Sequence, residues 1–330
     1  MMKQAAIIKP HSDTAFRLTV GPPSHWRCGR TITGLMQQCV IALVPAALLA
    51  FWRFGMPAVQ VVGVACAAAV ATEALVSRLR KRSLEIDNWN AFYAGLLFAF
   101  LLPPGAPWWL AAVGGVVTVA LGQSLFGGLG SNPFCAPLVG WAVCKVSWPA
   151  FMDADLALAA LPMNEPLAQL KYFGLASLEQ FDLLHLFLGE QVNAIGASQV
   201  AALLAGGLYL MVRGIIKPFV PLAFLAGLVL TAGIHWGIDP TLYAPPQFHL
   251  LTGSVVLGAF FLATDHGSSP CGVTAMILFG LLAGSLVAVI RIYGVYLDGV
   301  PFAILLANLM SPLLERIRPR PFGARRKSHA

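Results

Sequence analysis

Two aspartates stand at the margins of long apolar runs, where a charged side chain is costly. Asp265 lies in FFLATDHGSSP and Asp298 lies in YLDGVPF. Carboxylates inside or beside a bilayer are rare and tend to mark the routes of ions or protons. We therefore predict that both aspartates lie on an ion pathway. The alternative is that each is simply solvated or paired at the membrane surface.

Two glycine-rich turns with a Pro-Phe step accompany these aspartates. Residues 127–134 read GGLGSNPF, and residues 294–302 read GVYLDGVPF. Glycine permits close backbone approach. Proline lacks a backbone N–H, but in the first helical turn that N–H would have no acceptor within the helix, so both turns suit the sharp start of a helix. Free backbone N–H groups there can bind a phosphate, a flavin carbonyl or a quinone oxygen. A tight loop with close helix packing is the alternative.

The side chains around these turns predict a pocket for a cofactor or a quinone. An aromatic ring can stack on a flavin or quinone ring, and amides or hydroxyls can hydrogen-bond its edge. The predicted lining residues are Gly128, Asn132 and Phe134 from the first half of the chain, with Thr252, Gly253 and Asp298 from the second. GGLGSN is not a dinucleotide fingerprint, because it lacks a preceding strand and the GxGxxG spacing.

Composition determines the class of protein that must position these residues. Of the 330 residues, 58% are hydrophobic and 11% are charged, with a mean hydropathy of +0.76. Such a chain has too little polar surface for a soluble globule and is typical of an integral membrane protein. The net charge of +7 comes from cations beside apolar runs and at both ends, where anionic lipid attracts them, so nucleic-acid binding is not expected.

The apolar runs predict an all-α polytopic membrane protein of about ten spans. The expected spans are 35–54, 57–77, 89–102, 106–126, 133–150, 198–213, 218–236, 249–264, 271–292 and 300–315. The third and eighth runs are short, as in half-helices or broken helices. YAGLLFAFLLPP at 93–104 resembles GSVVLGAFFLATD at 253–265, which favours two inverted five-helix repeats.

The cations predict the orientation of these spans. Nearly all of the 21 lysines and arginines fall at the ends of the chain or in alternate loops, the exceptions being Arg53, Lys145, Lys171 and Arg291. The positive-inside rule then puts both termini in the cytoplasm. The expected segments are a cytoplasmic arm at 1–34, the first repeat at 35–150, an external loop at 151–197, the second repeat at 198–315 and a basic tail at 316–330. FDLLHLFLG in the external loop should form a helix against the membrane or a partner.

Cysteine spacing bears on redox cofactors. Six cysteines are scattered without a CxxC pair. Neither a zinc site nor a [4Fe–4S] cluster held by this chain alone is therefore expected.

Several stretches, in order along nearly the whole chain, resemble one family. They are PPSHWRCGRTITGLM, EALVSRLRKRS, NAFYAGLLFAFLLPPGAPWW, QSLFGGLGSNPFCAPLVG, PQFHLLTGSVVLGAFFLATD and YGVYLDGVPFAILLANLMSPLLERIRPRPFG. The chain is similar to the D subunit of the Rnf electron-transport complex and to its counterpart, the B subunit of the sodium-translocating NADH:quinone oxidoreductase. The resemblance implies ten spans in two inverted halves, partner subunits that carry flavin and iron–sulfur centres, and electron flow coupled to Na⁺ or H⁺ movement across a bacterial cytoplasmic (inner) membrane.

One departure from the family concerns its covalent flavin. The family joins FMN through a phosphoester to a threonine in a motif resembling S-x-A-T-P-L, whereas this chain has Ala160-Leu161-Pro162-Met163. Leu161 has no hydroxyl for the ester, and no Ser or Thr lies between Trp148 and Tyr172. We therefore expect covalent FMN to be absent and any FMN or riboflavin to be held non-covalently. Loss of this flavin, with electrons on another route, and loss of electron transfer through the chain are the alternatives.

The function favoured by these observations is that of a membrane subunit in an ion-translocating electron-transport complex, not an enzyme by itself. A quinone is a further candidate ligand. A stand-alone transporter or channel on the same inverted-repeat fold is the main alternative, and a purely structural role within a complex is the third.

Overall fold

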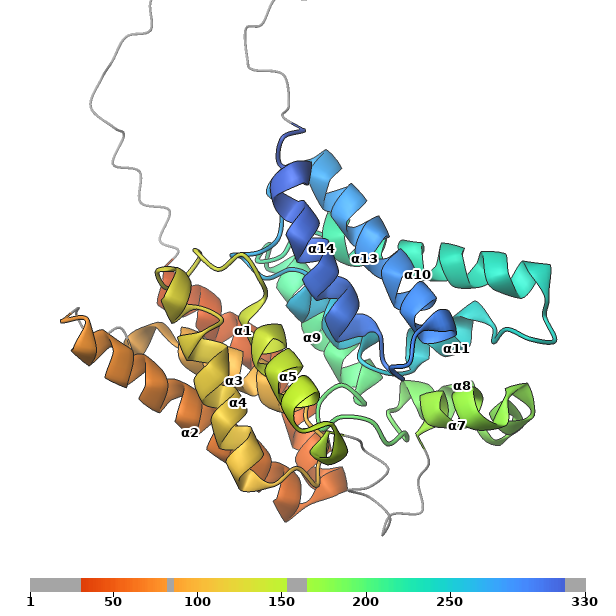
Figure 1. The fold of residues 1–330 in the computed structure, drawn as a ribbon, viewed down its shortest axis with the longest axis horizontal. Coiled ribbons are helices and arrows are strands. Elements are labelled where there is room, and N and C mark those ends of the chain that lie inside the picture. The colour runs from red at the N-terminus through yellow and green to blue at the C-terminus, as the bar shows by residue number, and fades with distance from the viewer. Residues whose placement is uncertain (1–30, 82–85, 153–164, 318–330) are drawn as a thin grey trace, which may run out of the picture. The chain divides into compact units, whose positions relative to one another are not determined.

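The computed structural model describes residues 31–81, 86–152 and 165–317 (Figure 1). Within these ranges the chain is helical and contains no strand. Five helices are long and apolar enough to cross a membrane: α1 (Ile32–Phe54), α2 (Met56–Leu79), α4 (Trp108–Ala120, continued by η2 to Phe126), α10 (Phe219–Ile238) and α13 (Val273–Tyr293). Four shorter apolar helices accompany them: α3 (Asn90–Phe100), α5 (Ala136–Ser147), α9 (Val200–Val212) and α14 (Val300–Leu314). The chain is thus a polytopic membrane protein.

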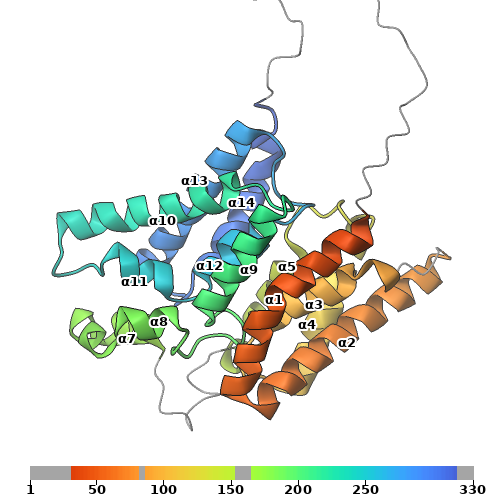
Figure 2. The same cartoon turned by 180° about the vertical axis from the view of Figure 1, so that it is seen from behind.

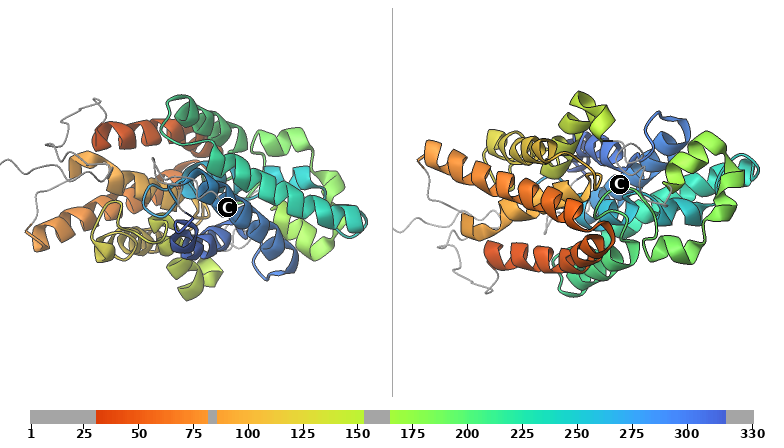
Figure 3. Two further views of the ribbon diagram at one scale, coloured as in Figure 1. Left: turned by 90° about the horizontal axis from the view of Figure 1, so that it is seen from above. Right: turned by 90° about the horizontal axis from the view of Figure 1, so that it is seen from below.

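The helices of the two halves of the chain pack in a matching order. In the first half, α2 packs against α3 and α4, and α4 packs against α5. In the second half, α10 packs against α13, and α13 packs against α14 (Figure 1). Among the described helices, α1 packs against α9 and α5 packs against α14 across the two halves, and the first of these pairs is visible from behind in Figure 2. Figure 3 shows the red-to-yellow helices of the first half gathered beside the green-to-blue helices of the second.

Glycines bring the paired long helices close together. A Cβ on Gly115 of α4 would stand 2.6 Å from the Ala65 carbonyl oxygen of α2. A Cβ on Gly284 of α13 would stand 1.9 Å from the Phe224 carbonyl oxygen of α10. Helices in lipid gain little from hydrophobic burial against each other, so this close backbone contact supplies the packing that holds them.

The third helix is by itself shorter than the thickness of a bilayer core. The 11 residues of α3 span roughly 16 Å, about half of a 30 Å hydrocarbon core. Carbonyls at and just beyond its C-terminal end accept hydrogen bonds from the segment before α9: Ile195 N donates to Leu102 O at 2.9 Å, and Gly196 N donates to Phe100 O at 3.2 Å. A helix end inside a membrane protein needs such partners because lipid offers none.

The eighth predicted span is broken once, into a first helix and a second helix whose last part is π-helical. The first is α11 (Pro246–Leu251), and the second comprises α12 (Val255–Leu257) and the π-helical η5 (Gly258–Leu262). The break falls at Thr252–Ser254, where Gly253 has a φ of 68°. Helix α11 cannot continue through this left-handed residue, so the segment changes direction there.

The segment predicted to be external contains the predicted helix in shorter form. Within FDLLHLFLG the helix is α8 (Leu183–Phe187); Asp182 caps its start and Gly189, with a φ of 87°, lies just beyond its end. It packs against α11 and follows α7 (Pro166–Phe173) and η4 (Leu175–Gln180). Leu161, most of the N-terminal arm and most of the basic tail lie outside the described residues.

Candidate functional site

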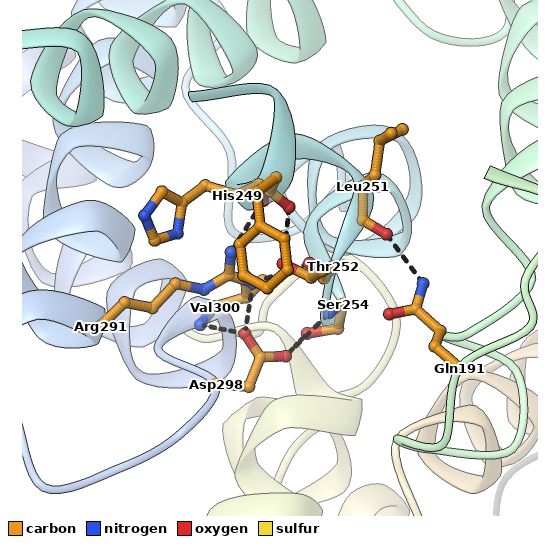
Figure 4. Close-up of polar contacts among 9 residues, drawn as sticks. Gln191, His249, Leu251, Thr252, Ser254, Arg291, Asp298 and Val300 are labelled. Atoms are coloured by element: carbon orange, nitrogen blue, oxygen red, sulfur yellow. Dashed lines mark hydrogen bonds and ion pairs between the residues drawn. The ribbon is translucent and has the colours of Figure 1, made fainter. Parts of the chain in front are cut away.

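A buried ion pair joins Asp298 to the end of α13. Arg291, in the last turn of α13, places Nη2 3.0 Å from Oδ1 of Asp298, and the arginine side chain is only 1% exposed. The same guanidinium donates from Nη1 to His249 O at 2.7 Å and from Nη2 to Thr252 O at 2.9 Å (Figure 4). Arg291 therefore satisfies the carbonyls that the end of α11 leaves without helical partners.

The carboxylate of Asp298 serves the other side of the same break. Its Oδ2 accepts from the backbone N–H of Ser254 at 2.8 Å and also from the Ser254 hydroxyl (Figure 4). Its Oδ1 accepts from Val300 N at 3.3 Å, at the start of α14. A Cβ on Gly253 would stand 2.4 Å from Arg291 Nη2. The ion pair thus ties α11, α12, α13 and α14 together at the Gly253 break, and it leaves no room for a larger residue there.

Several polar atoms around this break have no partner among the described residues. They include Nδ1 of His249, Nε of Arg291 and Oε1 of Gln191. Gln191 uses its Nε2 to donate to Leu251 O at 2.8 Å (Figure 4). Buried polar atoms normally find partners, so these three atoms carry a desolvation cost that the described residues do not offset.

Asp265 belongs to a second cluster at the opposite end of α13. Its Oδ2 accepts from Asn132 Nδ2 at 2.9 Å and from Ser268 Oγ at 3.0 Å. Asn132 Nδ2 also donates to Phe134 O at 2.9 Å. The amide thereby fixes the GGLGSNPF turn against the TDHGSS turn from the other half of the chain.

A cavity of about 160 Å³ opens beside the Asp265 cluster. Asn132, Asp265 and Tyr93 are among the residues that line it. So are Asn90 and Gln123, whose side-chain amides bond each other. The cavity is small but carries carboxylate, amide and phenol groups in its lining.

The structure divides the predicted pocket residues between these clusters. Asn132 and the Phe134 carbonyl lie with Asp265, whereas Thr252 and Gly253 lie with Asp298. Ser254, which bonds Asp298, and Asp265 lie eleven residues apart along α12 and η5, so the two clusters are separated by roughly 16 Å of helix. Gly128 lines neither cluster; it lines another cavity, of about 270 Å³, beside Arg80 and Ser124.

Arg291 was absent from the predicted site residues. As a lone cation at the end of an apolar run, it is expected to reach outward to headgroups, but its side chain is buried. Asp298, seven residues later at the same span end, is the signal that could have identified it, because an intramembrane charge usually has an opposite partner.

A cavity of about 380 Å³ lies beside Asp298 on the predicted external side. Aromatic rings line it: Trp141 packs edge-on against Phe302 with centroids 5.0 Å apart, and Tyr296 lies 4.4 Å from the same ring. Its polar lining includes Lys145 and Asn193, whose Nδ2 has no partner among the described residues. Its volume and mixed lining are typical of sites for small organic ligands.

Lys171 ties α7 to the rim of this cavity. Its ammonium donates to Gly294 O at 2.5 Å and to Val295 O at 2.8 Å, in the loop that leads to Asp298. Partial burial lowers the pKa of Lys171, because desolvation disfavours the charged form. The carbonyls compensate by accepting its hydrogen bonds, so the contact orders the 294–296 loop.

Over most of its length the chain is similar to one group of known proteins. The model of the NQR2, RnfD, RnfE family matches residues 19–323. The D subunit of a Na⁺-translocating ferredoxin:NAD⁺ oxidoreductase complex from Acetobacterium woodii is 36% identical, over 93% of this chain and 95% of the relative. The D subunit of a proton-translocating ferredoxin:NAD⁺ oxidoreductase complex from Clostridium ljungdahlii is 33% identical, over 93% and 97%. The D subunit of an ion-translocating oxidoreductase complex from Escherichia coli is 34% identical, over 94% and 99%.

Proposed function

Because the chain belongs to the NQR2, RnfD, RnfE family, we propose that it is the D subunit of an Rnf-type ion-translocating ferredoxin:NAD⁺ oxidoreductase complex in a bacterial cytoplasmic membrane. The observation that carries this proposal is the full-length match to relatives that bear this name. Its donor and acceptor sites then belong to partner subunits, and this chain contributes electron transfer and ion coupling within the membrane.

Ten spans in two inverted five-helix repeats are the fold we propose, with both termini in the cytoplasm. The equivalent contacts α2 with α4 and α10 with α13 support the repeat, as do α4 with α5 and α13 with α14. The short α3 and the broken α11–α12–η5 segment are equivalent in this scheme. Inverted-repeat membrane proteins use such interrupted helices near the midplane to free backbone groups for ligands.

The 380 Å³ cavity is our candidate for a non-covalent flavin site. Trp141 and Tyr296 would contact the ring, the unpartnered Asn193 Nδ2 could donate to a ring carbonyl, and Lys145 would balance a phosphate. The residues therefore fit FMN without an ester, in keeping with Leu161 at the family's attachment position. A bound flavin would supply one- and two-electron transfer, and the chain would orient it and limit water access.

Asp265 and Asp298 remain our proposed ion-pathway residues. Their positions near opposite ends of α13 suit binding points on the two sides of a membrane barrier. The pairing of Asp298 with Arg291 adds a local role, because the carboxylate is already charge-compensated and holds the helix break together.

Purification of the complex from native membranes tests the proposed function. The chain should copurify with flavin and iron–sulfur subunits. Denatured wild-type protein should show no in-gel flavin fluorescence for this chain, whereas acid precipitation of the complex should release flavin. Trp141→Leu and Lys145→Met should each lower the released flavin by one equivalent, and Trp52→Leu, on a side chain that is 81% exposed, should not.

Each failure has a separate meaning. A chain that purifies alone and transports a solute would replace the complex subunit with a stand-alone transporter. A fluorescent denatured band would overturn the non-covalent site, and unchanged flavin in both cavity variants would remove the flavin from this cavity and leave a quinone to be tested there.

A further inference from the structure

The seam between α14 and η5 contains an unexplained polar side chain. The two helices run alongside each other: a Cβ on Gly258 would stand 2.4 Å from Val300 Cγ1 and 3.4 Å from Ile304 Cδ1. Further along, Ser311 Oγ donates to Ser268 O at 2.9 Å. Asn308 lies on the same buried face of α14, between the levels of Ile304 and Ser311.

Asn308 is buried and has unused hydrogen-bonding capacity. It is 2% exposed, and neither Oδ1 nor Nδ2 has a partner among the residues that the structure describes. Burying an amide without partners costs about 1–3 kcal/mol by protein mutational data. Alanine or leucine would avoid this cost at a position whose neighbours on the same face are Ile304 and Ala307. A partner that the described residues do not include would therefore explain why an amide occupies this position.

Polar groups lead from Asn308 toward one end of the membrane. Ser311 bonds Ser268 O, and Ser268 Oγ bonds Asp265. Asp265 in turn accepts from Asn132. These contacts make a continuous line of oxygen-bearing groups from the cavity beside Asp265 to the turn of α14 next to Asn308.

Toward the other end the seam is aliphatic. Val300 and Ile304 are both fully buried and close on Gly258, and beyond them lie Asp298 and Arg291. The seam thus has a polar approach, an amide at its end, and then an apolar constriction before the Asp298 cluster. A π-helical segment such as η5 is rare and often lies at a functional site.

We propose that the Asn308 carboxamide is a ligand in a transient binding site for a partly hydrated monovalent metal cation, such as Na⁺, between Asp265 and the closely packed Val300 and Ile304. An amide oxygen is a hard ligand that can coordinate such a cation. The amide has no proton to exchange near neutral pH, so its placement favours a metal cation over a proton as the ion that passes. This inference rests on the proposed function of the chain.

The test uses the whole complex reconstituted in liposomes with reduced ferredoxin and NAD⁺. Uptake of ²²Na⁺ and internal pH are recorded together over a range of Na⁺ concentrations. Asn308→Leu removes the oxygen at similar volume. Leu309→Ala, on the neighbouring side chain that is 57% exposed, is the matched control. We expect Asn308→Leu to raise the Na⁺ concentration for half-maximal uptake about tenfold, the equivalent of about 1.4 kcal/mol of lost binding, with flavin content unchanged, and Leu309→Ala to leave it unchanged.

A second pair of variants covers a failure of Asn308→Leu to assemble. Asn308→Ser keeps a hydroxyl oxygen and Asn308→Ala keeps none, so the serine variant should retain a lower half-maximal Na⁺ concentration than the alanine variant. Equal Na⁺ dependence in these variants and the wild type would overturn the inference and leave a structural water as the partner of the amide. Proton uptake without ²²Na⁺ uptake by the wild type would also overturn it. A wild-type complex that moves neither ion would count against the proposed function itself.

Discussion

Replacing Gly253 by alanine should strongly destabilise the α11–α12 break. The backbone there has a φ of 68°, and the new Cβ would stand 2.4 Å from Arg291 Nη2 and 3.0 Å from Asp298 Oδ1. The left-handed conformation alone costs a non-glycine residue about 1–2 kcal/mol. The methyl group must also displace a guanidinium that bonds Thr252 O and Asp298.

The cost of that displacement sets the expected magnitude. A hydrogen bond to a charged group is worth about 1.5–3 kcal/mol, and the guanidinium is too enclosed to find water instead, since its side chain is 1% exposed. Adding the backbone strain gives a loss of about 3–5 kcal/mol in the free energy of unfolding. The α11–α12 break should loosen before the rest of the protein.

Two glycines provide matched controls. Gly128 has a φ of 111° with nothing within 4 Å of a Cβ, so Gly128→Ala carries the strain alone and should cost about 1–2 kcal/mol. Gly237, inside α10 with open space around it, should tolerate alanine and gain about 0.5–1 kcal/mol in helix stability. Equilibrium unfolding in mixed micelles, followed by tryptophan fluorescence, ranks the three variants. If Gly253→Ala loses no more free energy of unfolding than Gly128→Ala, then displacement of the Arg291 guanidinium contributes nothing to the loss.

Three further predictions concern packing and polar pairs. Gly114→Ala should lower the free energy of unfolding by about 1–3 kcal/mol through overpacking, because its Cβ would stand 2.0 Å from Cζ of Phe98. The double variant with Phe98→Leu should recover part of this loss in the same unfolding assay. No recovery would exclude this contact as the cause. Gln123→Leu should lower the free energy of unfolding by about 1–3 kcal/mol, because it leaves Asn90 buried without its amide partner. The melting temperature of the Asn90→Leu/Gln123→Leu double variant should lie closer to that of the wild type. Purely additive losses would contradict the pairing. Lys171→Met should speed hydrogen exchange at residues 294–296, whose carbonyls it bonds, measured by mass spectrometry in detergent; unchanged exchange would show that the loop is ordered without the ammonium.

Helix positions were predictable because each depends on a local property of the chain. A run of apolar residues long enough for a bilayer forms a helix wherever it occurs, since lipid leaves the backbone no other partner. The predicted spans 35–54 and 271–292 accordingly became α1 (Ile32–Phe54) and α13 (Val273–Tyr293). The shortness of the third and eighth runs was also visible, because too few apolar residues is a local feature, but the predicted span 249–264 ran through Gly253 and did not locate the break there.

The prediction of one pocket from two similar turns did not anticipate that the turns lie near opposite ends of α13. The turn at 127–134 meets Asp265 near the start of that helix, and the turn at 294–302 lies beyond its end. Similar sequence identified similar local structure but carried no information on which end of the bundle each turn occupies.

The sequence by itself therefore determined that this is a multi-pass helical membrane protein, which runs form its helices, and that Leu161 cannot carry an ester-linked flavin. Tertiary structure alone decided that Arg291 turns inward to Asp298, that Asn132 bonds Asp265 across 133 residues of chain, and that Asn308 is left without a partner among the described residues. The physical reason is that hydropathy and propensity act along the chain over a few residues, whereas each of these relations depends on which faces of distant helices pack together.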